Sequence, residues 1–334
     1  MTDAEKGRGT LGATRAVRHR GSWIVRSQES SVSSERAGVW LDAVNRLIDT
    51  AAPVHHSRHA VTYYWPRPDG GAYVKVYRRP RGMSAFKDCL RGSLAHRAAR
   101  ASRQLAAAGF RVPRVLAVAE ERRVLRAQRA WLATAALAGE PVASCLARLA
   151  AAIGSTSERS RYRTLLRQKR AVLSALGYEV ARLHEAGFVA GDLVPSNVWV
   201  AGCDDRPEIV LLDHDRTRWH RHGPYWWRAR RNLVQLNRIV LIGVSVNDRL
   251  RVLRAYAEGR RWPVGEARRR LPWLIAKTAE RRRRCDNVVV EKDRPVDFRT
   301  LMRPGGPYDS QRHTQTVRRV EGTPPVRRAD ERKG

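Results

Sequence analysis

The sequence predicts an α+β fold of two lobes, in which a small β-rich lobe with one helix precedes a larger, mostly helical lobe. Runs of aromatic and β-branched residues, typical of strands, cluster between residues 59 and 141. From residue 143 onwards, apolar residues recur mostly at helical spacing. The 334 residues, 43% of them hydrophobic, are enough for a sizeable core.

The small lobe is expected to span residues 36–138. The preceding residues 1–35 are polar and rich in Ser, Gly and Arg, so they are expected to be disordered. A short amphipathic helix at 36–50 opens the lobe, and two strands flank the turn sequence PRPDGG. An Ala- and Arg-rich helix over 84–109 follows, with Gly109 as its C-terminal signal. Two more strand-like runs, VPRVLAVAEE and RAWLATAALAGEPV, complete this region.

The large lobe is expected over residues 139–299. Its main element is a long helix at 161–186 with apolar side chains on one side. Short strands VWV and IVLL come next, and then three helical stretches near 225–246, 248–260 and 264–284. The polar residues 300–334 form a loose tail.

The charge of the chain favours anionic partners. The formal net charge is +33 and the sequence pI is near 11.4, which would attract nucleic acid, an acidic membrane surface or a polyanionic glycolipid. No secretory signal and no apolar run of spanning length is visible. The four cysteines are scattered, which argues against a zinc site or disulfide framework and favours a reducing cytoplasm.

Two stretches carry residues suited to phosphoryl transfer, HEAGFVAGDLVPSNVWV (184–200) and IVLLDHDR (209–216). Transfer of a phosphoryl group requires a carboxylate at the acceptor hydroxyl, oxygen ligands for Mg²⁺ and a lysine for the nucleotide phosphates. Asp192 and Asn197 have the five-residue spacing of a kinase catalytic loop. Asp213 ends an apolar strand, and Lys75 lies in the alternating strand AYVKVY.

Each of these residues also has a simpler explanation. Asp213 could merely cap a strand, Lys75 could be a solvated strand residue, and an Asp followed five positions later by Asn is common. Taken together, however, they occur in the right order and on the expected elements. This combination favours a kinase-like fold.

The sequence resembles the lipopolysaccharide kinases, the Kdo and heptose kinases often called the WaaP/InaA-like family, within the protein-kinase-like superfamily. HEAGFVAGDLVPSNVWV resembles that family's loop "H-x-x-G-x-x-H-x-D-L-x-x-x-N", and VLLDHDRTR resembles its strand end "LIDFDR". AYVKVYRRPRG is similar to its phosphate-lysine strand, GFRVPRVLAV to its "G-x-P-x-P" segment and WWRARRNLVQLNR to its "R-x-N-L-x-R-L-x-R" helix. The resemblance covers roughly residues 55–245.

The resemblance implies a role for each matching residue. Asp192 would be the catalytic carboxylate, Asn197 and Asp213 would bind Mg²⁺, and Lys75 would bind the ATP phosphates. The hinge that holds adenine would lie near Thr134–Gly139. The roles of Asp215 and Arg216 stay open, and His214, in place of the usual Phe, is interpreted as a packing residue.

The implied activity is ATP-dependent phosphorylation of a Kdo or heptose hydroxyl of the lipopolysaccharide inner core. The substrate would be the anionic lipid A-core glycolipid at the cytoplasmic face of the inner membrane. The protein is therefore expected in the cytoplasm, peripheral on that membrane and attracted by its anionic surface.

Two positions depart from the family pattern. Ala190 replaces the loop histidine, which in kinase folds chiefly braces the loop. The small-lobe helix also lacks the glutamate that pairs with the phosphate lysine. The only acidic residue between Lys75 and Ala119 is Asp88, whereas the glutamate would fall near Ala98.

Three alternatives remain open. The departures at Ala190 and in the small-lobe helix are compatible with a pseudokinase that acts as a binding or regulatory module. A protein kinase or antibiotic phosphotransferase would share the fold, although the basic surplus argues against cationic aminoglycosides. Specific nucleic-acid binding has only the charge in its favour, since no recognition motif is visible.

Overall fold

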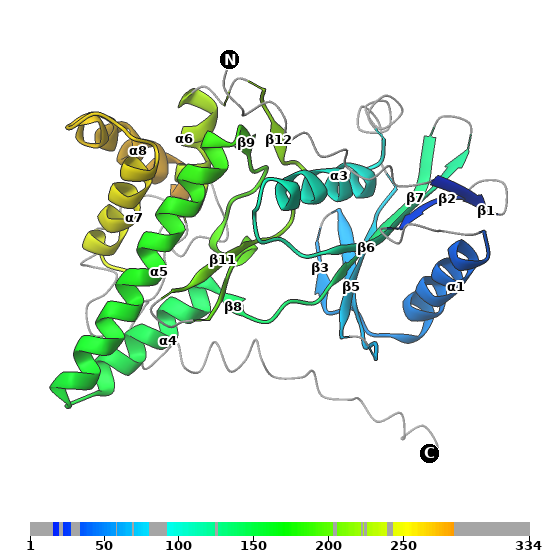
Figure 1. Ribbon diagram of the computed structural model, residues 1–334, viewed down its shortest axis with the longest axis horizontal. Helices are drawn as coiled ribbons and strands as arrows, with labels where there is room; N and C mark the ends of the chain where they lie inside the picture. Colours follow the sequence, from blue (N-terminus) through cyan, green and yellow to red (C-terminus); the bar gives the residue numbers. More distant parts are fainter. Residues whose placement is uncertain are drawn as a thin grey trace, which may run out of the picture.

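The protein consists of a sheet-based small lobe and a larger helical lobe, which confirms the predicted α+β class (Figure 1). The structure is a computed structural model. It describes residues 16–19, 23–27, 34–57, 59–68, 70–79, 92–123, 126–202, 206–221, 223, 226–238 and 243–283. The expected loose tail and the first fifteen residues lie outside these ranges.

The small lobe is built on an antiparallel seven-stranded sheet of order β1-β2-β6-β7-β5-β4-β3. Its strands are β1 (Ala16–His19), β2 (Trp23–Ser27), β3 (His55–His56), β4 (Ala60–Trp65), β5 (Ala72–Tyr77), β6 (Val115–Arg123) and β7 (Arg126–Ala135). Antiparallel neighbours joined by short turns agree with the strand runs read from the sequence.

Disorder throughout residues 1–35 was a wrong prediction for β1 and β2. Trp23 to Ser27 of β2 pair with Glu121 to Ala117 of β6, and Val25 is fully buried. The polar composition of the surrounding residues concealed a short run, WIV, whose side chains gain burial only when β6 is beside them.

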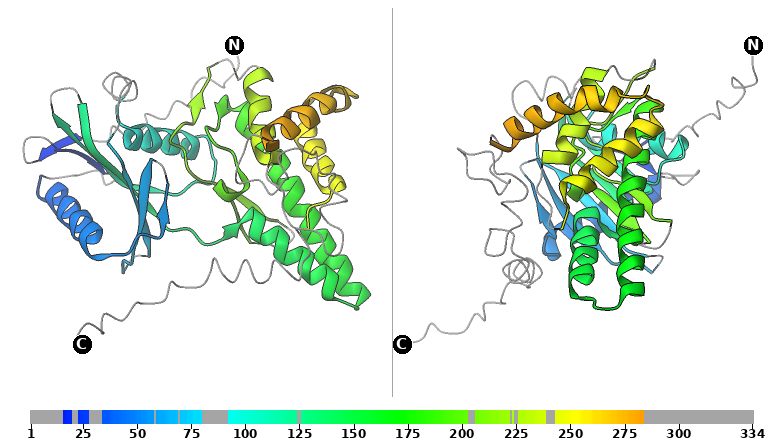
Figure 2. Two further views of the ribbon diagram at one scale, coloured as in Figure 1. Left: turned by 180° about the vertical axis from the view of Figure 1, so that it is seen from behind. Right: turned by 90° about the vertical axis from the view of Figure 1, so that its left-hand side faces the viewer.

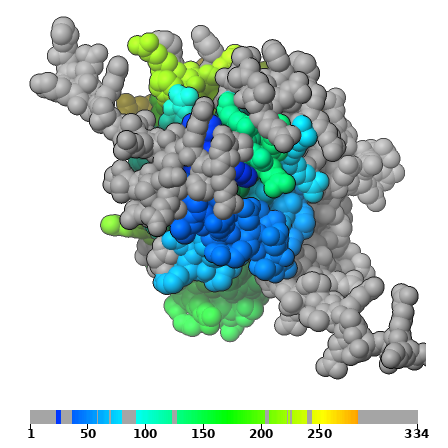
Figure 3. Space-filling model, turned by 90° about the vertical axis from the view of Figure 1, so that its right-hand side faces the viewer, coloured from blue at the N-terminus to red at the C-terminus, as the bar shows by residue number. Residues whose placement is uncertain are grey.

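Two helices cover the two faces of this sheet. α1 (Ser34–Thr50) buries Leu41, Val44 and Leu47 in a cluster that includes Val74 and Trp131 of the sheet. Figure 3 shows α1 at the outer end of the lobe. α3 (Leu94–Ala107) packs on the opposite face through small side chains, namely Ala95, Ala98 and Ala99. α3 covers only part of the helix expected at 84–109, because Ser93 caps its start by accepting from the amide of His96 and the helix ends at Ala107. Residues 80–91 lie outside the described ranges.

The large lobe is mostly helical, as predicted. Its elements are β8 (Glu140–Pro141), α4 (Val142–Ser155), α5 (Arg159–Glu185), β9 (Phe188–Val189), β10 (Val198–Ala201), β11 (Glu208–Leu211), β12 (Arg218–Trp219), α6 (Trp226–Arg238), α7 (Val246–Gly259) and α8 (Glu266–Arg283). α4 and α5 form a helical hairpin, and α7 lies along α5 (Figure 2). In the parts of the chain described, no helix has both the length and the apolar character to cross a membrane.

Close contact between α5 and α7 depends on a glycine. A Cβ atom at Gly177 would lie 2.4 Å from the carbonyl oxygen of Val252 on α7. The helices therefore approach more closely than a side chain at this position would allow. α5, held in this way, ends directly at the loop predicted to be catalytic.

The segment that follows α3 is attached to the large lobe. Phe110 is buried, stacks under the guanidinium of Arg182 on α5 at 3.9 Å, and packs edge-on against Phe188 of β9. The amide of Leu211 donates a hydrogen bond to the carbonyl of Arg111 at 3.0 Å. The lobes thus touch through residues 109–111 as well as through the covalent connection after β7.

Candidate active site

The predicted catalytic loop lies between α5 and β10. It leaves α5 through Gly187, passes β9 and ends in a single helical turn, Pro195–Asn197. The carboxylate of Asp192 is exposed. The side-chain nitrogen of Asn197 donates to the backbone carbonyl of Asp192 at 3.0 Å, so the five-residue spacing closes the loop on itself.

Asp213 lies next to Asn197 at the end of β11. The pairing of β10 with β11 continues in a hydrogen bond of 2.9 Å from the amide of Leu212 to the carbonyl of Asn197. Asp213 itself has a positive φ of 55°, a left-handed conformation uncommon outside glycine. Strained backbone of this kind is concentrated at functional sites, where it aims a side chain. The two predicted metal ligands are therefore neighbours.

Lys75 reaches both Asp213 and Asp215 from the small lobe. Its Nζ atom lies 2.8 Å from Oδ1 of Asp213 and 2.7 Å from Oδ2 of Asp215. The hydroxyl of Tyr77, two residues along β5, donates to Oδ1 of Asp215 at 2.5 Å. We call Lys75, Tyr77, Asp213 and Asp215 the lysine cluster. Lys75 is thus not the solvated strand residue of the simpler explanation.

The charges of the lysine cluster are coupled. Burial lowers the pKa of Lys75, but the charges of Asp215 and Asp213 outweigh it and the net pKa is raised. Burial raises the pKa of Asp213, yet the ion pair with Lys75 brings it below its usual value. Burial and the charge of Asp213 raise the pKa of Asp215 to about 6. At neutral pH two carboxylates share one cation, so the cluster carries a net negative charge that would attract a further cation.

Helix α6 braces the loop at Ala190. The side-chain amide of Asn232 accepts from the amide of Ala190 at 3.0 Å and donates to its carbonyl at 2.8 Å. Gln235, one turn along α6, donates to the carbonyl of Gly191 at 3.1 Å and to Oδ1 of Asp192 at 3.3 Å. The loop is thus held through its backbone, without the histidine that the family pattern places at 190.

A second buried contact fixes Asn232. His184, at the end of α5, lies 3.1 Å from Oδ1 of Asn232 through Nε2 and 2.9 Å from the Tyr256 hydroxyl through Nδ1. The three side chains are fully buried. Burial lowers the pKa of His184 to about 4, so the ring is neutral. Because an amide oxygen only accepts, Nε2 carries the proton and Nδ1 accepts from Tyr256.

Within the described residues of the small-lobe helix there is no acidic partner for Lys75. α3 contains no Asp or Glu, and Ala98, the expected glutamate position, is buried against the sheet. Asp88 lies outside the described residues. The carboxylates that bind Lys75 come from the large lobe instead.

His214, Arg216 and the predicted adenine hinge lie around the lysine cluster and the catalytic loop without joining them. His214 is buried and its Nε2 lies 3.0 Å from the carbonyl of Leu211, consistent with a packing residue, and burial lowers its pKa to about 4. Arg216 packs over Gly191, where a Cβ atom would come within 2.2 Å of the Arg216 Cβ. β7 ends at Ala135, inside the predicted adenine hinge Thr134–Gly139, which stays a prediction.

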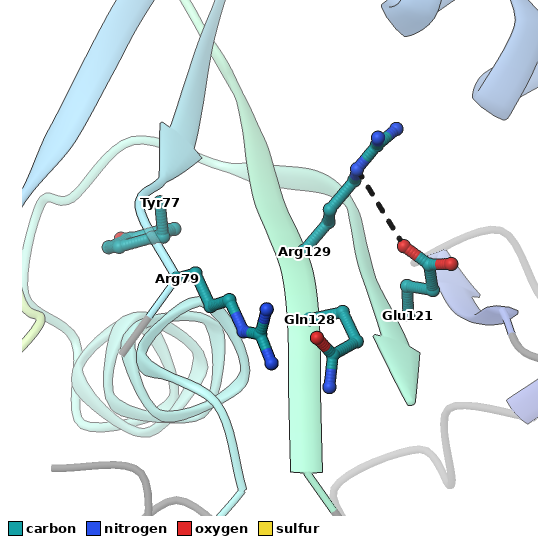
Figure 4. A pocket seen from close by; sticks show the side chains of 5 residues that line it. All are labelled: Tyr77, Arg79, Glu121, Gln128 and Arg129. Carbon is teal, nitrogen blue, oxygen red and sulfur yellow. Dashed lines mark ion pairs between the residues drawn. The ribbon is translucent and has the colours of Figure 1, made fainter. Parts of the chain in front are cut away.

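A polar pocket lies beside the lysine cluster on the small lobe. It is lined by Tyr77, Arg79, Glu121, Gln128 and Arg129, with an ion pair of 3.8 Å between Arg129 and Glu121 (Figure 4). Of these residues only Tyr77 belongs to the lysine cluster, and the loop carboxylate Asp192 does not line it. We therefore do not assign the chemistry to this pocket.

Sequence reasoning missed Tyr77, Asn232 and Gln235, and left Asp215 without a role. A signal for the α6 pair existed, since Asn232 and Gln235 are polar residues one turn apart among apolar ones in NLVQL. Tyr77 stands two residues after Lys75 and so shares its face of β5. Which carboxylate binds Lys75 and Tyr77, however, is determined by tertiary structure alone.

The fold and the site define the class. A β-rich lobe carrying Lys75, joined to a helical lobe carrying Asp192, Asn197 and Asp213, is a kinase-like fold. A solved structure described as WaaP in complex with acyl carrier protein is similar with a TM-score of 0.53 and 21% identity, over 73% of this chain and 91% of that one. At that identity the likeness shows the fold.

The family follows from the sequence match. The model of the lipopolysaccharide kinase (Kdo/WaaP) family matches residues 62–256, more than half of the chain, and the chain belongs to this family. The match includes the lysine cluster, the catalytic loop and Asn232. No curated protein matches the sequence at a significant level. The resemblance stated from the motifs is confirmed, and the protein is a member of a kinase family.

Proposed function

We propose that the protein is an active ATP-dependent kinase that phosphorylates a Kdo or heptose hydroxyl of the lipopolysaccharide inner core. One observation carries the proposal. Asn197 closes the loop of Asp192 and lies beside Asp213, whose carboxylate is 2.8 Å from Lys75. Hydrogen bonds therefore connect all four predicted site residues, in one case through Leu212, the neighbour of Asp213 in the chain.

The donors at this site fit Mg²⁺. Asp213 offers a carboxylate that is 37% exposed, and Asn197 offers an amide oxygen. Within the described ranges no group of three or more His, Cys, Asp and Glu side chains is arranged to hold a metal ion. Mg²⁺ is commonly held by one or two protein oxygens, with phosphates and waters completing its shell. Bound there with ATP, Mg²⁺ would neutralise charge on the transferred phosphoryl group.

Asp192, Lys75 and Asn232 would each have a separate role in the reaction. Asp192 would orient the acceptor hydroxyl and accept its proton, with one carboxylate oxygen fixed by Gln235. Lys75 would bind the nucleotide phosphates from β5. Asn232 holds the backbone of Ala190, on the N-terminal side of Asp192, and would thereby help to keep Asp192 in position for the acceptor.

Charge and exposed aromatic residues support an anionic glycolipid as acceptor, bound at the cytoplasmic face of the inner membrane. Trp219 of β12 and Trp227 of α6 are both more than half exposed, and Arg228 stacks on Trp227 at 4.5 Å. β12 pairs with β9, immediately before the catalytic loop. Tryptophan and arginine together suit the boundary between lipid and anionic headgroups. The WaaP complex makes acyl carrier protein a second partner to test.

The lobe boundaries are also a proposal. We divide the chain into a small lobe, 36–138, and a large lobe, 139–299, extended at the N-terminus by β1 and β2. Gly139 supports this boundary, because its φ of 136° is accessible chiefly to glycine and its Cβ would lie 2.6 Å from the carbonyl of Val200.

A pseudokinase is the second candidate, favoured by the absence of an acidic residue from α3. The deciding experiment compares core lipopolysaccharide from a deletion strain with the same strain carrying wild-type protein or Asp192→Ala. Mass spectrometry should show one phosphate fewer in the deletion strain and in the strain with the variant. An unchanged phosphate content in the deletion strain, or full restoration by Asp192→Ala, would contradict the enzyme.

A further inference from the structure

We propose that Asp215 positions Lys75 for the nucleotide phosphates and that Tyr77 holds Asp215 in place. The inference rests on the proposed function, because it assigns the missing partner of the phosphate lysine. In kinases that partner is a glutamate on the small-lobe helix. Here it would be a residue of the large lobe, two positions after the metal ligand.

The two carboxylates on Lys75 have different surroundings. Asp213 is 37% exposed and adjoins Asn197, so it can turn to a metal ion. Asp215 is 17% exposed, and both of its oxygens are already bonded, one to Lys75 and one to Tyr77. When Asp213 binds the metal, Asp215 is the carboxylate that remains with Lys75.

The ring of Tyr77 packs in the small-lobe core, and its hydroxyl is directed to Asp215. Its side chain is 5% exposed, so its hydroxyl requires a hydrogen-bond partner, and Asp215 supplies one. Tyr77 and Lys75 share one face of β5, so a single carboxylate can bind both. Ala98 of α3 packs in the same apolar cluster as Tyr77, so a glutamate at this position would be buried. Because Asp215 already binds Lys75, α3 can pack against the sheet through alanines instead.

With Asp215 as its partner, the position of the Lys75 side chain depends on how the two lobes are arranged. The Lys75–Asp215 pair joins residues 140 positions apart and crosses from the small to the large lobe. A lysine paired within its own lobe is preorganised whatever the lobes do. Here, the lysine is positioned only when β5 and the segment after β11 are together, so nucleotide binding and lobe closure are coupled.

The test measures binding rather than turnover. Calorimetry gives the Kd of ATP with Mg²⁺, of ATP with EDTA, and of adenosine, for wild type, Asp215→Asn, Tyr77→Phe and Asp213→Asn. We expect Asp215→Asn to weaken ATP binding about tenfold or more, with and without Mg²⁺. Tyr77→Phe should act in the same direction but less, and adenosine should bind all proteins equally. Asp213→Asn should weaken binding only when Mg²⁺ is present.

Asp248→Asn is a matched control. It removes a carboxylate that pairs with a lysine, Lys169, at the same 2.7 Å distance, but both residues of this pair belong to the large lobe. It should lower thermal stability and leave the Kd of ATP unchanged.

The outcomes distinguish the proposed kinase function from the positioning role of Asp215. No ATP binding by the wild type would contradict the proposed function. Binding by the wild type with no change in Asp215→Asn, or a change seen only with Mg²⁺, would overturn the positioning role. If Asp215→Asn does not fold, Tyr77→Phe decides, and an unchanged Kd in that variant would overturn the inference.

Discussion

Replacing Asn232 by alanine should destabilise the protein strongly, because one buried amide holds three neighbours. It bonds His184, both backbone groups of Ala190, and Gln235 at 2.8 Å. A net hydrogen bond contributes about 1 kcal/mol, and a buried group left without a partner costs about 1–3 kcal/mol. Asn232 makes four such bonds, at about 1 kcal/mol each. We therefore expect a loss of about 4 kcal/mol in the free energy of unfolding.

Urea unfolding followed by tryptophan fluorescence measures this loss, and a thermal scan should show a fall of roughly 10 °C. Asn237→Ala is the control on the same helix. Its amide nitrogen donates to Thr278 of α8 rather than to the loop. Both variants should lose stability, but only Asn232→Ala should speed hydrogen exchange in residues 188–197. An Asn232→Ala protein within 1 kcal/mol of wild type would refute the bracing role.

Three further predictions concern other parts of the molecule. Asp192→Asn should abolish phosphate transfer to core lipopolysaccharide while calorimetry shows unchanged binding of Mg-ATP; retained transfer would remove Asp192 from its role. Gly177→Ala should lower the free energy of unfolding in urea by about 1–3 kcal/mol, because a Cβ would lie 2.4 Å from a backbone oxygen. Gly154→Ala is the control and should not lower it, because a Cβ there would have nothing within 4 Å. Burial lowers the pKa of His184 to about 4 from 6.5, so its stabilisation is complete above pH 6.5 and is lost as the pH falls toward 4. The stability difference between wild type and His184→Gln should therefore shrink by about 3 kcal/mol from pH 7 to pH 4, and a difference that does not vary with pH would contradict a neutral histidine.

Local sequence predicted the parts of the site that local geometry determines. Asp192 and Asn197 belong to one loop, and their spacing is fixed by the hydrogen bond that closes it. Asp213 follows β11, which pairs with the preceding strand β10 directly after Asn197, so its place beside Asn197 could be inferred from order alone. Lys75 was recognisable because its strand alternates.

Contacts across the fold were beyond such reasoning. The partner of Lys75 was sought at a helical spacing along the small lobe, whereas Asp215 is 140 residues away. The family pattern places the brace in the loop itself, as the histidine at position 190, whereas Asn232 reaches Ala190 from 42 residues later. In both cases a missing side chain suggested lost function, while the structure supplies the contact from another element. β2 was missed for the same reason, since Val25 is buried where β2 pairs with β6, and β1 in turn pairs with β2.

The attachment of residues 109–111 to the large lobe has a mechanical consequence. Apart from the bonds of Lys75 and Tyr77 to Asp213 and Asp215, the lobes are joined at two separate places. These are the chain after β7 and the contacts of Phe110 and Arg111 with α5, β9 and β11. Two fixed points define an axis, and a body held at both can turn about that axis but not twist or slide freely. Separation of Lys75 from Asp213 and Asp215 thus reduces to rotation about one line. A single pair of probes, one on β5 and one on the segment after β11, would report the whole motion.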